Sequence, residues 1–329
     1  MIIKATNTRV STVRCTETPY FTGGLFAQPV EGGHLALVPT GANERGLTGY
    51  IASWSDILKL TELSDSALVG VNQKFEGEGY APDEVWQPST NRSNRGFQAA
   101  EAWGAISYQA HCNNDATYAA VARYLSITIH AAGFRLRDVA RTHHSQLGWA
   151  LLEKRKPGSR FSNVAMTDLY LAFHSLASEL CSARDHLAKI AIIQCNAKSS
   201  IDGMARFEDW LTKPINMDAA SEPLTALLLS VYGTKTEPGW LRTMGDVRNE
   251  MVHRQPMAAN PKTAFLLFSE TTTPAGPVYT IRLTSVEKGE KTVDPFQTLL
   301  DLYKNFESLA ISASTLAKYK AEPPQVVGH

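Results

Sequence analysis

The feature that most constrains the fold is a change of hydrophobic period at about residue 115. Beyond it, apolar residues recur every three or four positions, as Val121, Leu125, Ile129, Ala132, Leu136 and Val139. This spacing places them on one face of a long helix, and Asn114 or Asp115 could cap its start. Because such a helix must bury its apolar stripe against other elements, this part of the chain predicts packed helices.

Further segments follow the same helical period. A second long helix is expected over about residues 163–195, with the stripe Leu169, Phe173, Leu176, Leu180 and Leu187. Shorter helices are expected over 223–232 and 240–254, the latter stopped by Pro256. The clearest stripe follows Pro295 and comprises Phe296, Leu299, Leu300, Tyr303, Phe306, Leu309, Ala313 and Leu316. Between these helices, residues 264–268 and 278–283 predict a β-hairpin, with 271–277 in its loop.

The first hundred residues have a different character. Glycine and proline recur between short apolar pieces, which predicts short strands and turns with one brief helix near residues 56–63. Residues 87–96 hold no large apolar side chain and predict an exposed loop or a boundary. We therefore expect an α+β protein with a smaller β-rich N-terminal region (1–105), a mainly helical bundle with an inserted hairpin (106–322) and a tail (323–329).

Composition narrows the class of protein. Lysine plus arginine and aspartate plus glutamate number 32 each, so the basic excess typical of a duplex binder is absent, although a local basic cleft is compatible with this balance. Cys15, Cys112, Cys181 and Cys195 are scattered, which predicts buried thiols in a reducing compartment rather than a disulfide frame or zinc site. With no run of 18 apolar residues and no signal-peptide pattern, we expect a soluble cytoplasmic protein without a membrane partner, metal or cofactor.

The segment Met244–Arg254 holds the residues that suggest a chemistry. Arg248 is followed directly by Asn249 and, after three more residues, by His253, late in a predicted helix that two long helices precede. This pattern resembles the signature of the HEPN superfamily (higher eukaryotes and prokaryotes nucleotide-binding domains), over roughly residues 115–320. The resemblance implies a HEPN-like helical bundle of ribonuclease type, and a homodimer in which two copies of the motif line one cleft.

These residue types suit metal-independent cleavage of RNA. The imidazole of His253 titrates near neutrality and can move the proton of the attacking 2′-hydroxyl or of the leaving 5′-oxygen. The planar guanidinium of Arg248 can stabilise the extra negative charge on phosphorus, and Asn249 can orient the imidazole or contact the phosphate. Helix geometry puts Arg248 and His253 about 140° apart, so a second copy is expected to complete the site. The expected products carry a 2′,3′-cyclic phosphate and a 5′-hydroxyl.

Other residues are candidates for supporting roles. Glu179 and His186 share a polar stripe of the second long helix that could face the cleft, with Arg184 contacting RNA, or could simply be solvated. Arg254 directly follows the histidine. On the first long helix, a basic group could contact the RNA backbone or form an ordinary charged face; it comprises Arg135, Arg137, Arg141, His143 and His144.

Two classes of function fit these features. The first is a metal-independent endoribonuclease of toxin or phage-defence type, acting on RNA as a dimer and controlled by its N-terminal region, by an antitoxin or by another regulatory protein. Family members controlled by AMPylation have a tyrosine two residues after the histidine, where this chain has Gln255, so that route is not expected. The second is a non-catalytic HEPN-like module that binds nucleic acid, a nucleotide or a partner protein, which the neutral net charge favours. The alternative to both functions is that the arginine and the histidine are ordinary residues near a helix end, whose only role is to interact with the helix dipole.

Overall fold

The computed structural model describes residues 14–76, 84–90, 94–249, 264–285 and 294–322, and these form an α+β fold, as the sequence predicts. The N-terminal part is a six-stranded antiparallel sheet in the order β4-β3-β2-β1-β5-β6. Its strands are β1 (Arg14–Phe21), β2 (Phe26–Pro29), β3 (Leu35–Asn43), β4 (Gly46–Ala52), β5 (Leu68–Glu76) and β6 (Glu84–Pro88). The brief helix expected here is α1 (Trp54–Leu63), which Ser53 caps by accepting from the Asp56 amide.

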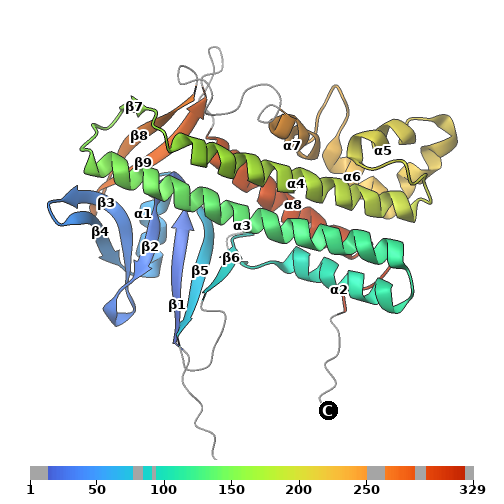
Figure 1. Cartoon of the computed structure of the whole chain (residues 1–329), viewed down its shortest axis with the longest axis horizontal. Helices are drawn as coiled ribbons and strands as arrows, with labels where there is room; N and C mark the ends of the chain where they lie inside the picture. Colours follow the sequence, from blue (N-terminus) through green and yellow to red (C-terminus); the bar gives the residue numbers. More distant parts are fainter. Residues whose placement is uncertain (1–13, 77–83, 91–93, 250–263, 286–293, 323–329) are drawn as a thin grey trace, which may run out of the picture.

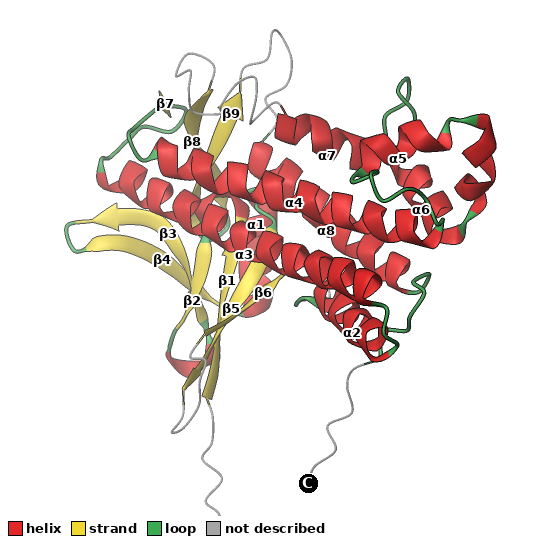
Figure 2. Cartoon of the chain, turned by 45° about the vertical axis from the view of Figure 1, so that its right-hand side comes forward, coloured by secondary structure: helices red, strands yellow, loops and turns green. Residues whose placement is uncertain are grey.

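The helical part is built on two long helices, α3 (Ala116–Leu152) and α4 (Met166–Gln194), which lie side by side (Figure 1). The sheet packs on one side of α3, and α4 lies on the other. The remaining helices are α2 (Gln98–Cys112), α5 (Met204–Leu211), α6 (Pro223–Tyr232), α7 (Trp240–Asn249) and α8 (Pro295–Ser314). Figure 2 shows α5, α6 and α7 gathered along α4, on the side away from α3.

The predicted helical stripes are the buried faces of these helices. On α3 the stripe is buried from Leu125 onward, whereas Val121 is half-buried, and Asp115 caps the helix by accepting from the Tyr118 amide at 3.2 Å. The stripes of α4 and α8 are also buried, except that Leu316 lies beyond the end of α8. Helix α2 was not predicted, because alanines supply much of its buried face, and a stripe of such small residues gives a weak periodic signal.

The predicted hairpin is present, with longer strands than expected. Strands β8 (Ala264–Thr273) and β9 (Gly276–Ser285) pair antiparallel, and β7 (Arg160–Phe161) joins β8 at the other edge. The residues 271–273, assigned to the loop, continue β8 instead. The three threonines are β-branched and therefore favour the strand, while Gly276 adopts a φ of +122° directly after the two-residue turn.

The N-terminal sheet and the helices share one buried apolar cluster. Residue 105, where we placed a boundary, lies inside α2. The short turn Thr22–Gly24 lies against α3 so closely that a Cβ on Gly24 would stand 2.8 Å from the His143 carbonyl oxygen. The path of the backbone around Thr22 is therefore determined by its packing against α3, which lies about 120 residues later in the sequence.

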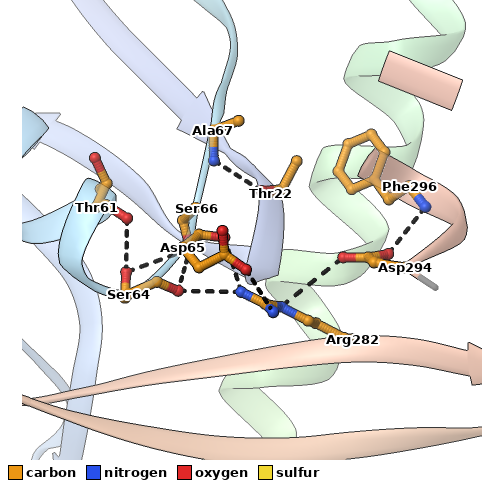
Figure 3. Close-up of polar contacts among 9 residues, drawn as sticks. All are labelled: Thr22, Thr61, Ser64, Asp65, Ser66, Ala67, Arg282, Asp294 and Phe296. Carbon is orange, nitrogen blue, oxygen red and sulfur yellow. Dashed lines mark hydrogen bonds and ion pairs between the residues drawn. The ribbon is translucent and has the colours of Figure 1, made fainter. Parts of the chain in front are cut away.

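An arginine joins the hairpin to the turn between α1 and β5 (Figure 3). Arg282 of β9 donates to the carbonyl oxygens of Ser64 (3.1 Å) and Asp65 (2.7 Å) and pairs with the Asp65 carboxylate at 2.9 Å. On its other side, Asp294 lies 3.9 Å away and accepts from the Phe296 amide at the start of α8. Burial raises the pKa of Asp294 to about 6, against the opposing effects of the Phe296 amide and Arg282.

Two further expectations bear on the environment of the chain. The thiols of Cys15 and Cys112 are exposed, so the expectation of four buried cysteines was wrong for these two, which lie on the outer surface of β1 and the end of α2. Cys181 is buried and Cys195 is half-buried. Within the described ranges, every helix is too short or too polar to cross a membrane.

Candidate functional site

Helix α7, which carries the candidate motif, is held by three neighbouring helices. Its residues Leu241 and Met244 are buried against the core. Arg242 forms an ion pair with Glu208 of α5, and its guanidinium lies 4.0 Å from the ring centroid of Tyr232 in α6. Toward α4, the thiol of Cys181 donates to the Met244 carbonyl oxygen at 3.6 Å. The helix therefore has a defined rotation about its axis.

Arg248 lies in the last turn of α7 and faces the α4 side. It stands four residues after Met244, which puts the two about 40° apart around the helix. Its Nη1 donates to Oδ1 of Asn249 at 3.0 Å, so the two motif residues contact each other. Its Nε is buried and has no hydrogen-bond partner among the described residues. His253 and Arg254, the other candidates of the motif, lie outside the described residues.

Arg184 of α4 lies beside this part of α7. Its Nε donates to Oδ1 of Asp185 at 3.1 Å, and its Nη2 is 3.1 Å from the same oxygen. Its Nη1 lies so close to Gly245 that a Cβ there would approach within 2.4 Å. The α4–α7 arginine cluster, as we call Arg184, Asp185, Arg248 and Asn249, thus brings together residues more than 60 positions apart.

The charges of the cluster act on the buried groups around it. Burial raises the pKa of the Cys181 thiol, while Arg184, the neighbouring Asp185 and Arg248 also act on it, the two arginines in the lowering direction. Burial lowers the pKa of Arg184, but Asp185 and other groups outweigh it, so that pKa is raised. Two guanidiniums therefore lie near one buried thiol.

Glu179 and His186 are not brought to this cluster. His186 faces α3, where its Nδ1 lies 3.4 Å from Oγ1 of Thr128 and its ring centroid 5.8 Å from that of Tyr124. Burial lowers its pKa. Glu179, seven residues earlier, shares that face of α4, about 160° around the helix from Cys181. His186, from the stripe proposed to face the cleft, thus contacts α3, whereas Arg184 and Cys181 are α4 residues that contact α7.

The basic residues predicted to form a group on α3 contact different partners. Arg135 pairs with Asp138 and Arg141 with Glu84, while the Arg137 guanidinium lies 4.8 Å from the Phe134 ring centroid. His143 is fully buried, and His144 contacts the Gly24 carbonyl oxygen at 3.0 Å. These residues do not form one basic surface, because they point to different sides of a helix that packs on both the sheet and α4.

Sequence reasoning missed two members of the site environment. Gly245 stands inside a helical pattern, where a glycine costs about 1 kcal/mol relative to alanine and often marks a close approach; here the approaching group is Arg184. Asp185 directly precedes His186 of the predicted polar stripe, and only its contacts reveal its role. Among the described residues, no group of three His, Cys, Asp or Glu side chains is arranged to hold a metal ion.

Comparisons with family models, with curated proteins and with solved structures return no match for this chain. The motif and the geometry of the α4–α7 arginine cluster are therefore the grounds on which a function is proposed.

Proposed function

We propose that this protein is a metal-independent endoribonuclease of toxin or phage-defence type, built on a HEPN-like helical bundle. The observation that carries the proposal is the state of Arg248. This motif arginine lies in the last turn of α7, contacts Asn249 at 3.0 Å, and has a buried Nε for which no described residue is a hydrogen-bond partner. A buried donor without an acceptor costs free energy, and an oxyanion that accepts from it would remove that cost.

The proposed chemistry divides the work between two residues. Arg248 and its Asn249 neighbour bind the phosphate and stabilise the charge that grows on its oxygens. His253 moves a proton, accepting one from the 2′-hydroxyl or donating one to the leaving 5′-oxygen. The 2′-oxygen forms a bond to phosphorus as the bond to the 5′-oxygen breaks, which leaves a 2′,3′-cyclic phosphate and a 5′-hydroxyl.

A homodimer would supply the second half of the site. Arg248 and His253 lie about 140° apart around one helix, so two copies facing each other would place both pairs around one cleft. Isologous dimers are the commonest oligomers. Control would come from the N-terminal region, whose sheet packs against α3 and whose turn between α1 and β5 is bound by Arg282 of the hairpin, or from a separate regulatory protein.

The experiment is cleavage of defined RNA by the purified chain and by Arg248→Ala and His253→Ala. Both variants should lose at least 100-fold in rate, as removal of a charge-stabilising or proton-transferring group does in other enzymes, while circular dichroism stays unchanged. Arg206→Ala on α5, whose exposed ion pair is with Asp202, is the matched control and should keep full activity. End analysis should find the cyclic phosphate.

The competing function is a non-catalytic HEPN-like module. The balanced charge, 32 basic against 32 acidic residues, favours it. A folded wild-type chain that binds RNA or a nucleotide without cleaving it would establish this alternative and refute the nuclease.

A further inference from the structure

The contact between α4 and α7 places two guanidiniums on one side of the motif helix. Arg184 reaches across from α4 and lays its Nη1 against Gly245. Gly245 and Arg248 are three residues apart in α7, so their side-chain positions are neighbours on the helix surface, roughly 5–6 Å apart. The Arg184 guanidinium therefore lies close to the base of the Arg248 side chain.

Arg184 is held in one orientation. Oδ1 of Asp185 accepts from its Nε at 3.1 Å and also accepts from the Met204 amide at the start of α5, at 3.2 Å. The fit is tight, because a Cβ on Gly203 would lie 3.1 Å from the Asp185 carboxyl carbon. With the orientation fixed on one side by Asp185, Nη1 faces α7, and no described residue accepts a hydrogen bond from it.

Arg184 and Arg248 differ in whether a nearby carboxylate balances the charge of the guanidinium. Arg184 is paired with Asp185 and its side chain is only 13% exposed, whereas Arg248 has no carboxylate partner among the described residues. Two guanidiniums on one side of α7 favour an anion there, most strongly where water is partly excluded. An anion with several acceptor oxygens could interact with both guanidiniums and would also accept from the Nε of Arg248, which has no hydrogen-bond partner among the described residues.

We propose that Arg184 is a second phosphate-binding residue, which together with Arg248 binds a backbone phosphate of the RNA. The proposal rests on the ribonuclease function proposed above. Asp185 is a positioning residue, because it orients Arg184 without contacting the phosphate. Gly245 provides the space that lets Arg184 reach α7.

The test separates binding from cleavage by using two probes. The first is the RNA substrate, and the second is the same oligonucleotide with 2′-deoxyribose at the scissile position, which binds but lacks the attacking hydroxyl. Arg184→Gln should weaken binding of the second probe by about 10- to 100-fold, the range expected for loss of a charge-assisted hydrogen bond. KM should rise by the same factor with a smaller change in kcat. Arg184→Lys should lie between, since it keeps the charge and loses the planar fork.

Gly245→Ala is the sharper variant, because it keeps every charge. The new methyl group would stand 2.4 Å from Nη1 and must displace the guanidinium, while alanine favours the helix. Binding should weaken about tenfold in a chain that folds at least as well as the wild type. The matched control is Gly104→Ala in α2, where the new Cβ would lie 3.4 Å from Oγ of Ser126, an ordinary contact; it should leave binding unchanged.

The outcomes are distinguishable. If Arg184→Gln and Gly245→Ala bind and cleave like the wild type, the two-arginine site is refuted and the ribonuclease proposal stands. If the wild type binds the deoxy-substituted probe through Arg184 but does not cleave the RNA substrate, the nuclease proposal fails and the phosphate site stands. If Arg248→Ala binds the deoxy-substituted probe as tightly as the wild type does, the shared phosphate site is also refuted.

Discussion

Replacement of His143 by phenylalanine should remove a large pH dependence from the stability of the fold. His143 is fully buried on α3, with its ring stacked on Phe296 at 4.9 Å and edge-on to Phe173 at 5.7 Å. Its Nδ1 lies 3.1 Å from the Val139 carbonyl oxygen, and its Nε2 is buried with no hydrogen-bond partner in the described part of the chain. The imidazole is thus held neutral, donating from Nδ1, in an aromatic pocket that phenylalanine fits.

The magnitude follows from the two pKa values of His143. Burial lowers its pKa from 6.5 to about 4 in the folded chain, against a smaller raising effect of the Val139 carbonyl. The unfolded chain therefore binds more protons between these values, so the stability that the neutral imidazole contributes is present above pH 6.5 and is lost as the pH falls toward 4. At pH 4.5 the loss relative to pH 8 is roughly 2.5 kcal/mol by this linkage.

The assay is urea unfolding of the wild type and His143→Phe at pH 8 and pH 4.5. Relative to the wild type, the variant should gain roughly 2.5 kcal/mol in free energy of unfolding between the two pH values. The pH dependence contributed by groups present in both proteins, such as Asp294 and Glu307, cancels in that difference. His111→Phe on the exposed end of α2 is the control and should follow the wild type. If His143→Phe changes the free energy of unfolding by the same amount at both pH values, His143 is not buried as a neutral imidazole.

Three other predictions follow from the structure and the proposed function. Glu307→Gln should stabilise the chain by roughly 2.5 kcal/mol more at pH 8 than at pH 5 in thermal or urea unfolding. The reason is that burial raises the Glu307 pKa from 4.5 to about 7, so the wild type loses stability as that carboxyl ionises. Equal effects at the two pH values would contradict this prediction. RNA cleavage should survive excess EDTA, since arginine and histidine carry the proposed chemistry, and activity lost on chelation and restored by a divalent ion would indicate another nuclease class. Light scattering at micromolar concentration should find a dimer, and a monomer that still cleaves RNA would exclude the composite site.

Local spacing was sufficient for the parts of the fold that depend on near neighbours in the chain. The buried faces of α3, α4 and α8, the start of α6 at Pro223 and the position of α1 follow from repeats of three or four residues and from capping residues. The candidate motif likewise needed only the sequence, since Arg248 and Asn249 are adjacent. These features are determined by contacts within one or two helical turns.

Tertiary packing alone decided which side chains meet. Arg184 and Arg248 are 64 positions apart, and both lie on the α4 side of α7 because Gly245 leaves room for the Arg184 guanidinium, whereas His186 of the same helix faces α3. His143 stands in a basic segment and Glu307 in an amphipathic helix, yet both are buried, because the aromatic side chains of α4 and α8 enclose the first and the amide of Ala99 at the start of α2 binds the second. Periodicity gives the face on which a residue lies, but the element that covers that face is chosen by shape and burial over the whole chain.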